Sequence, residues 1–212
     1  KFTKLYEARN LAIKKSGGKY ISFLDVDDWW MSNKLEKQTD LFLLDPSLDI
    51  VYSNCYCINN ESKRRKLYIT KKLPSGSIAQ KLLDSYSIGI LTAMVKKNIF
   101  EKNKFSNKYD IIGDFDFFVR MSIKNKIKAI QKPLAYYRSH NFNLSKNKNS
   151  QHIKELSFWI NKNKKNKIFK NFSFKGVYIL LQILEIKKNL SEDNKLDAFL
   201  KIFSYPYALS KL

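Results

Sequence analysis

Three carboxylates lie close together directly after an apolar run near the start of the chain. The run covers residues 20–24, and it is followed by Asp25, Asp27 and Asp28. Carboxylates a few ångströms apart repel one another, and each raises the pKa of its neighbours unless a cation lies between them. A hard divalent cation that holds a phosphate would relieve this repulsion, because Mg²⁺ and Mn²⁺ prefer oxygen ligands and leave positions open for substrate oxygens.

Helices and strands are predicted to alternate around this acidic turn. Residues 4–15 have helical apolar spacing that ends at Gly17, and residues 19–24 predict a buried strand. The end of such a strand is where open α/β sheets bind ligands. A second helix is expected to begin at a Ser32 cap and to end before Pro46. Its predicted apolar positions are Leu35, Leu41, Phe42 and Leu44.

The rest of the chain continues the alternation and then changes in composition. Further strands are predicted at residues 49–56, 67–70, 90–95, 127–130 and 133–137. Helices are predicted at residues 77–85, around 115–122, at 174–188 and at 193–203, with a loop at 103–112. The pattern predicts a layered α/β domain over residues 1–145. A basic helical region is predicted for residues 146–212, which begin with a Lys- and Asn-rich stretch.

Composition limits the class of protein without selecting a partner. The chain has 212 residues, of which 44% are hydrophobic, which is enough for one sizeable core. A net charge of +21 favours anionic partners such as a membrane surface, nucleic acid or phosphorylated ligands, although an AT-rich genome explains part of the lysine excess equally well. Cys55 and Cys57 are expected to be reduced thiols in a cytosolic protein. The longest apolar stretch, residues 177–186, is shorter than the roughly 20 residues that span a bilayer.

Several motifs occur in an order and spacing that is more specific than any one of them alone. They are Ala8-Arg9-Asn10 with Ser16-Gly17-Gly18, then Phe23-Leu24-Asp25-Val26-Asp27-Asp28-Trp29-Trp30 with Lys34-Leu35 and Gln38, then Gly113-Asp114-Phe115-Asp116, and finally Tyr137-Arg138-Ser139-His140. Together they resemble the nucleotide-sugar half of family 2 glycosyltransferases, which have the Rossmann-like GT-A fold. The resemblance covers about residues 3–145 and implies a layered α/β sheet of this type with a C-terminal helical tail. The family's usual opening strand is missing before Lys1, so the chain resembles an N-terminally truncated member.

The resemblance implies roles for the acidic residues. Asp25 and Asp27 match the Asp-x-Asp motif, so Asp27 is expected to coordinate Mn²⁺ or Mg²⁺ on the donor diphosphate, and Asp25 to face the ribose or the waters of the metal. Asp114 matches the catalytic base. Its position at the start of a predicted helix agrees, because the helix dipole favours an ionised carboxylate. The chain departs from the pattern at Gly113, where many members have Glu. Asp116 is expected to form a helical ion pair with Arg120.

The resemblance also implies donor-binding roles for basic and polar residues, each with a structural alternative. Arg9 and Asn10 match the segment near the donor base and diphosphate, and Arg138 is expected to stabilise the diphosphate. His140 is expected to bind the metal or the diphosphate. The alternatives are a surface arginine for Arg9 and a structural histidine for His140. Trp29 and Trp30 either shape the acceptor pocket or pack in the core.

The function implied is that of a metal-dependent inverting glycosyltransferase in surface polysaccharide synthesis. Its expected partners are a nucleoside-diphosphate sugar and a glycan or lipid-linked acceptor, with no nucleic acid. The alternative is a non-catalytic basic domain of the same fold that associates with membrane or nucleic acid. Basic residues before the helix predicted at 174–188 fit a cytoplasmic protein that docks on the inner face of the plasma membrane, or a helix that packs on the catalytic domain. They are Lys162, Lys164, Lys165, Lys167 and Lys170.

Overall fold

The computed structural model describes residues 4–59, 64–141, 143 and 148–192. They form two compact units. The first contains the chain up to Ala79 together with Tyr86–Asn141, and the second contains Gln80–Ser85 and the described residues from 143 onward. The division into domains at residue 145 stays a prediction.

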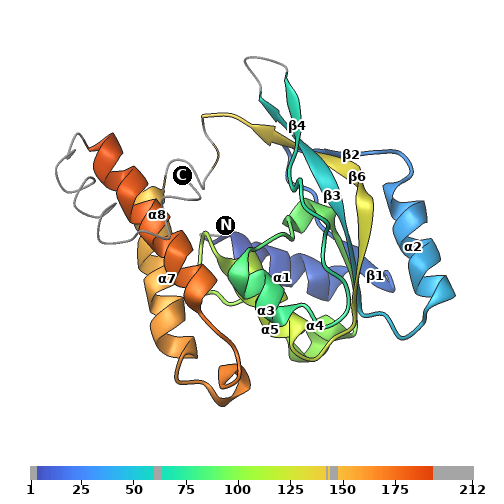
Figure 1. Cartoon of the computed structure of the whole chain (residues 1–212). Helices are drawn as coiled ribbons and strands as arrows, with labels where there is room; N and C mark the ends of the chain where they lie inside the picture. The colour runs from blue at the N-terminus through green and yellow to red at the C-terminus, as the bar shows by residue number, and fades with distance from the viewer. Residues whose placement is uncertain (1–3, 60–63, 142, 144–147, 193–212) are drawn as a thin grey trace. The chain divides into compact units, whose positions relative to one another are not determined.

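A mixed six-stranded sheet forms the centre of the first unit (Figure 1). Along the sheet the strands are β1 (Tyr20–Ser22), β5 (Ala93–Lys96), β3 (Ile50–Asn59), β6 (Ile127–Ser139) and β2 (Trp29–Trp30), and β4 (Arg65–Leu67) pairs with β3 off this path. Only β3 and β6 pair in parallel, and the other pairs are antiparallel. The acidic turn therefore connects β1 at one edge of the sheet to β2 at the other.

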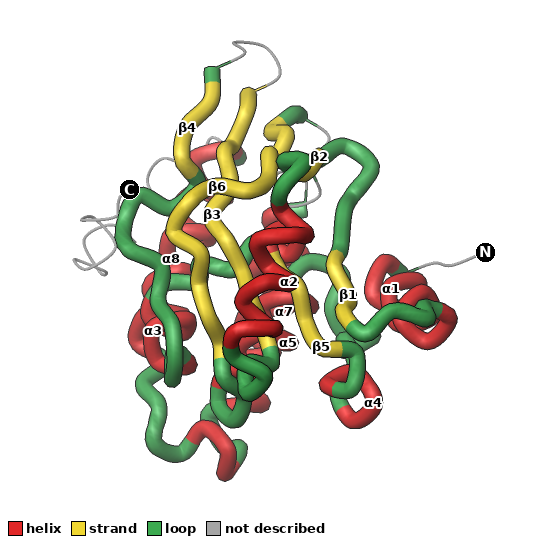
Figure 2. The backbone as a smooth tube through the Cα atoms, turned by 90° about the vertical axis from the view of Figure 1, so that its right-hand side faces the viewer, coloured by secondary structure: helices red, strands yellow, loops and turns green. Residues whose placement is uncertain are grey.

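Helices cover both faces of this sheet. The helix α2 (Lys34–Leu44) lies against one face, and α5 (Gly113–Ser122) lies on the other (Figure 2). The helix α1 (Leu5–Lys15) precedes β1, and the short helices η1 (Ile90–Thr92) and α4 (Ile99–Lys102) flank β5. Phe42 of α2 packs with Leu48, Val51 and Met94. These layers confirm the predicted α/β class.

The buried face of α2 differs from the predicted apolar face. Its buried residues are Lys34, Gln38 and Phe42, whereas Leu35 is 45% exposed and Leu44 is 81% exposed. This face is buried because it makes a polar contact with another segment of the protein. The Gln38 amide donates to the carbonyl oxygen of Thr92 at 2.8 Å. The helix also begins after Asn33 without a side-chain cap, so the predicted Ser32 cap is wrong.

The predicted strands differ from the observed ones in several places. Of the strand predicted at 67–70 only residue 67 lies in β4, and the strand predicted at 90–95 begins as the helix η1, so only its second half belongs to β5. The segments 127–130 and 133–137 form one strand, β6, whose register against β3 shifts beside Ser53 and Asn54. This irregularity accommodates Pro133, which has no N–H to donate. Trp29 and Trp30 form the short strand β2, which pairs with Tyr136 and Ala135 and which the sequence pattern does not indicate.

The second unit has a small core of its own. It contains α3 (Ala79–Asp84, from Gln80 on), α7 (Asn149–Asn163), η2 (Lys167–Phe169) and α8 (Lys175–Ser191). Trp159 is fully buried, and its ring lies 5.5 Å from that of Phe169 and 5.6 Å from that of Phe174. Within the basic helical region predicted at 146–212, no individual helix is predicted where α7 lies, because Lys and Asn residues are interspersed with its apolar residues Leu156, Trp159 and Ile160.

The helix α8 confirms the prediction at residues 174–188, and the helix predicted at 193–203 lies outside the described residues. Within the part of the chain that the structure describes, no helix has the length and apolar character needed to cross a bilayer.

The buried Lys34 predicts an unusual dependence of stability on pH. Burial lowers its pKa from 10.5 to about 7, so between these values the unfolded chain binds more protons than the folded chain. The free energy of unfolding should therefore rise with pH over this window, at a slope approaching about 1.4 kcal/mol per pH unit. Denaturant unfolding of Lys34→Met should lack this rise, whereas Lys37→Met on the same helix should keep it. Equal slopes in both variants would contradict the prediction.

Candidate active site

Each carboxylate of the acidic turn contacts a partner that another part of the first unit supplies. Asp25 forms an ion pair with Arg9 of α1 at 2.7 Å. A carboxylate oxygen of Asp27 lies 2.7 Å from Nε2 of His140, which follows β6. The Asp28 carboxylate accepts the backbone N–H of Arg138 at 2.9 Å. The structure thus brings together the residues of two separate motifs, the acidic run and the segment 137–140.

The turn concentrates negative charge. Burial, together with the charges of Asp27 and Asp25, raises the pKa of Asp28 to about 6, against the hydrogen bond from the backbone of Arg138. A bound cation would favour the ionised form of all three acids. The cluster therefore has the electrostatic character expected of a site for a positive ligand.

The side chains at the turn fit a divalent cation that takes most of its ligands from a bound diphosphate and from water. Asp27 and His140 offer one carboxylate and one imidazole at adjoining positions. Among the residues that the structure describes, no group of three or more His, Cys, Asp or Glu side chains is placed to hold a metal. The Asp27 carboxylate would suit Mg²⁺ or Mn²⁺ when diphosphate oxygens and water complete the coordination, because such ions are commonly held by one or two carboxylates and substrate phosphates.

Asp114 lies in the first turn of α5 and is partly buried. Its carboxylate accepts the N–H of Phe115 at 2.8 Å. Burial raises the pKa of Asp114, and this effect exceeds the opposing influence of the Phe115 N–H and of the Arg9 charge. Desolvation therefore opposes the predicted effect of the helix start, which favours the ionised carboxylate.

Tyr6 of α1 contacts Asp114 directly, although none of the sequence motifs includes it. Its hydroxyl oxygen accepts the Asp114 N–H at 3.0 Å. Its one hydrogen can be donated either to the Asp114 carboxylate at 3.4 Å or to the Ile111 carbonyl at 3.3 Å. Burial raises the pKa of Tyr6, so the hydroxyl keeps its proton. The available signal was spacing, because Tyr6, Arg9 and Asn10 share one face of a helix.

Gly113 is explained by the same tyrosine. A Cβ atom at Gly113 would lie 2.4 to 2.6 Å from three atoms of the Tyr6 ring. Contacts this short do not occur between side chains, so a larger residue would displace the ring. The departure from the family pattern at this position therefore accompanies the tyrosine on α1.

A continuous set of contacts joins the acidic turn to Asp114. Arg9 binds Asp25, and its guanidinium carbon lies 5.3 Å from the centre of the Tyr6 ring. Tyr6 in turn bonds to Asp114. The side chain of Arg9 is 10% exposed, which argues against the alternative of a surface arginine.

Aromatic packing beneath these contacts fixes the ends of β1 and α5. The ring of Phe23 lies 5.5 Å from that of Phe105, which lies 4.6 Å from that of Phe117 and 5.4 Å from that of Tyr6. The Phe105 backbone is also held by Asn10, whose amide donates to its carbonyl at 2.9 Å and accepts its N–H at 3.1 Å. These contacts give Asn10 a structural task, and its donor-binding role stays a prediction.

The two tryptophans lie in different environments, one in the core and one at the surface. Trp30 packs with Cys55, Leu91 and Ala135, and its indole N–H donates to the Leu91 carbonyl at 3.0 Å. Trp29 is 40% exposed. Trp30 therefore belongs to the core, whereas Trp29 is available at the surface.

Asp116 has the predicted structural role. Its carboxylate accepts two hydrogen bonds from the Arg120 guanidinium, at 2.9 and 3.0 Å. The residue is 3% exposed. Of the two acids at the start of α5, Asp114 is therefore the one that Tyr6 and Arg9 connect to the acidic turn.

Comparison with known proteins agrees with this arrangement. The model of glycosyl transferase family 2 matches residues 2–125. The chain belongs to this family. It is 34% identical over 145 residues to the Escherichia coli UDP-Glc:alpha-D-GlcNAc-diphosphoundecaprenol beta-1,3-glucosyltransferase WfgD, covering 66% of this chain and 54% of WfgD. It is 29% identical over 163 residues to the amylovoran biosynthesis glycosyltransferase AmsB of Erwinia amylovora, covering 72% of this chain and 52% of AmsB. The family 2 chain thus spans about half the length of these relatives.

Solved structures identify the fold as GT-A. A crystal structure of S. aureus TarS residues 1–349 aligns with a TM-score of 0.52 at 14% identity, covering 87% of this chain and 60% of that one. A second TarS structure aligns with a TM-score of 0.54 at 12% identity, covering 86% and 31%. At these identities the likeness concerns the fold alone, and it confirms the predicted GT-A class.

The contact between Gly113 and Tyr6 leads to a prediction about stability. Gly113→Ala should lower the free energy of unfolding by about 1–3 kcal/mol, because the added methyl group overlaps the ring of Tyr6. Gly17→Ala is the matched control, since a Cβ at Gly17 meets no atom within 4 Å. Urea titrations of both variants measure the difference. A Gly113→Ala protein as stable as Gly17→Ala would refute the steric explanation.

Proposed function

We propose that this chain carries the donor site and the catalytic base of a metal-dependent inverting glycosyltransferase. It would move a sugar from a nucleoside-diphosphate sugar to a hydroxyl group of a glycan or lipid-linked acceptor in surface polysaccharide synthesis. The observation that carries the proposal is the contact path from Asp25 through Arg9 and Tyr6 to Asp114. Membership of family 2 and the printed activities of WfgD and AmsB support the substrate class.

In this mechanism Asp114 accepts the proton of the acceptor hydroxyl. The oxygen of that hydroxyl attacks the anomeric carbon of the donor sugar, and the bond from this carbon to the diphosphate oxygen breaks. Direct displacement inverts the anomeric configuration. The partly buried position of Asp114 favours this role, because a base with a raised pKa takes up a proton more readily than an ordinary aspartate.

The acidic turn and its partners would hold the donor diphosphate. Arg9 and Arg138 supply positive charge for phosphate oxygens, Asp25 lies beside the ribose, and Asn10 supports the adjoining loop. Asp27 and His140 would hold Mn²⁺ or Mg²⁺, whose Lewis acidity neutralises charge on the departing nucleoside diphosphate. Until the donor arrives, Asp25 pairs with the Arg9 guanidinium and Asp27 contacts the His140 imidazole.

The second unit supports placement at a cytoplasmic membrane surface. Exposed basic side chains occur in and after the last turn of α7, with the partly exposed apolar residues Phe158 and Ile168 near them in the sequence. The basic residues are Lys162, Lys164, Lys165, Lys167 and Lys170. Anionic lipids attract such clusters by about 1 kcal/mol for each basic residue near the surface. This placement would bring the enzyme to lipid-linked acceptors.

Removal of the two central carboxylates tests the function. Asp114→Asn should lower the rate of sugar transfer by about 10²–10⁴-fold, because the base is lost. Asp27→Ala should abolish the dependence of nucleoside diphosphate release on Mn²⁺ or Mg²⁺. Asp40→Asn, an exposed carboxylate on α2, is the control and should behave like the unchanged protein. Unchanged rates in Asp114→Asn and Asp27→Ala would refute the proposal.

The raised pKa of Asp114 predicts the acid limb of the pH–rate profile. The usual pKa of an aspartate is 3.8, and burial moves that of Asp114 upward, so kcat/KM should fall at a higher pH than for an ordinary aspartate. The Tyr6 hydroxyl lowers this pKa, so Tyr6→Phe should move the acid limb to still higher pH. A profile of kcat/KM against pH for both proteins measures the shift. A limb that stays in place or moves to lower pH in Tyr6→Phe would contradict the assignment.

A further inference from the structure

A row of three aromatic rings crosses neighbouring strands of the sheet. Trp29 of β2 is the register partner of Tyr136 of β6, and Tyr136 is the register partner of Tyr56 of β3. The ring centres of Trp29 and Tyr136 lie 5.1 Å apart, and those of Tyr136 and Tyr56 lie 5.7 Å apart. We call these three residues the aromatic row. Because register partners point to the same side of a sheet, the row lies on one face.

The aromatic row is not part of the core. Trp29 is 40% exposed, and Tyr56 and Tyr136 are half-buried. The next residue, Trp30, points to the opposite face and packs in the core, as alternation along a strand requires. In the described sheet β2 is the last strand, so no strand covers the outer side of the Trp29 indole.

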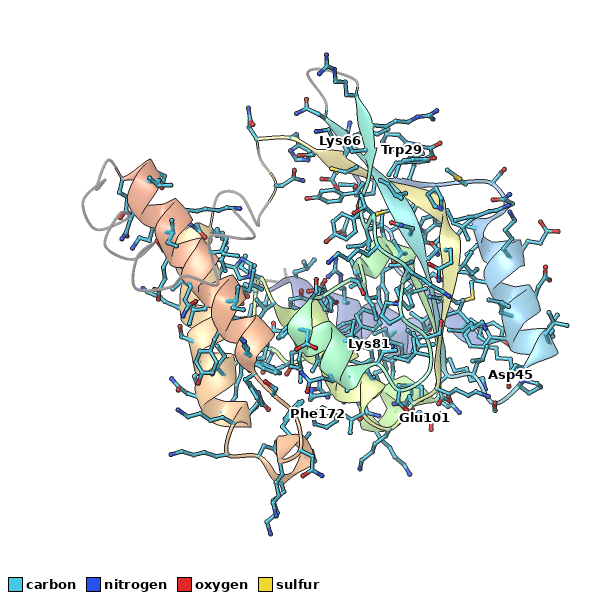
Figure 3. All side chains as sticks on the ribbon, viewed as in Figure 1. Trp29, Asp45, Lys66, Lys81, Glu101 and Phe172 are labelled. Atoms are coloured by element: carbon cyan, nitrogen blue, oxygen red, sulfur yellow. The ribbon has the colours of Figure 1, made fainter. Side chains whose placement is uncertain are left out.

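Positive charge lies at the other end of the row. The Arg65 guanidinium carbon of β4 is 5.2 Å from the centre of the Tyr56 ring. Arg65 is the register partner of Ile58, two residues from Tyr56, so its exposed side chain lies on the face of the aromatic row. Figure 3 shows Lys66, the next residue of β4, at the same end of the sheet as Trp29, and its side chain lies on the opposite face from Arg65. The face of the aromatic row therefore changes from an exposed indole to a guanidinium along one line of strands.

The row is continuous with the candidate active site. Trp29 follows Asp27 by two residues, and Tyr136 precedes Arg138 by two residues. The hydrogen bond from Arg138 to Asp28 and the contact of His140 with Asp27 fix the two strands beside the acidic turn. A molecule that occupies the row at Trp29 thus lies next to the donor-binding residues.

A sugar ring attached to a phosphate matches this surface. The C–H groups on one side of a pyranose ring pack well against the negative face of an indole, and tryptophan provides a large rigid surface for such contact. An anionic linkage suits the exposed Arg65, whose guanidinium lies beside the Tyr56 ring. We propose that the aromatic row is the acceptor subsite, where Trp29 stacks on a pyranose ring of a diphosphate-linked glycan whose anionic group lies toward Arg65. This inference rests on the proposed glycosyltransferase function and specifies where its acceptor binds.

A binding measurement without any donor tests the subsite. The probe is a short-chain alkyl diphosphate glycoside of N-acetylglucosamine, titrated into the purified protein by calorimetry. Trp29→Ala should weaken binding by about 10-fold, which corresponds to the loss of one well-stacked aromatic contact. Trp29→Phe, which keeps a ring, should restore most of the affinity. Tyr178→Ala is the matched control, because Tyr178 of α8 has the same 40% exposure.

Removing the diphosphate from the probe tests its sugar and its anionic group separately. The methyl glycoside of the same sugar, which has no diphosphate, should bind more weakly to the unchanged protein, and Arg65→Ala should reduce this difference. Absence of probe binding, equal affinity in Trp29→Ala and the unchanged protein, or an equal loss in Tyr178→Ala would each overturn the subsite. Donor turnover is measured separately with Asp114→Asn. A failure of the proposed function appears there, whereas a failure of the subsite appears only in the titrations.

Discussion

The packing of Tyr6 and the phenylalanines behind it is the constraint on which the site depends. Asp25 and Asp114 are far apart in the sequence, and neither strand pairing nor a shared helix places them together. Instead, Phe23 and Phe117 both pack against Phe105, so the end of β1 and the first turns of α5 are held on one aromatic cluster. Rings in close contact tolerate little displacement, because protein interiors are packed at crystalline density. The geometry of the carboxylates is therefore set by apolar contacts that lie beneath them.

The acidic turn illustrates how a protein can prepare for a charged ligand. Each of its carboxylates is satisfied by a different kind of group: a guanidinium for Asp25, an imidazole for Asp27 and a backbone N–H for Asp28. None of these partners lies on the turn itself, so the side-chain contacts of the turn depend on α1 and on the residues at the end of β6. A ligand that binds at the turn would replace these existing polar contacts of the carboxylates. The polar groups are already oriented toward the turn before binding, which lowers the reorganisation needed.

Much of the candidate site could be predicted from the sequence, because its acidic residues lie in motifs with fixed spacing. The positions of Asp25, Asp27 and Asp114 and the order of α1, β1 and α2 follow from local patterns. Features that depend on distant partners could not be predicted. The strand at Trp29 and Trp30 exists only because β6 lies beside it, and Lys34 is buried because Gln38 satisfies carbonyl groups that belong to β3 and η1. Tyr6 was missed for the same reason, since its partners begin at residue 105.

The close approach of Tyr6 to Gly113 restricts the order in which this site can evolve. Two positions on different helices must change together, because a side chain at residue 113 and a ring at residue 6 compete for one volume. An acidic residue at position 113 would displace the ring at position 6, and with it the hydroxyl that contacts Asp114, unless position 6 changes as well. The pair is thus epistatic, and glycine and tyrosine are expected to be inherited as a unit.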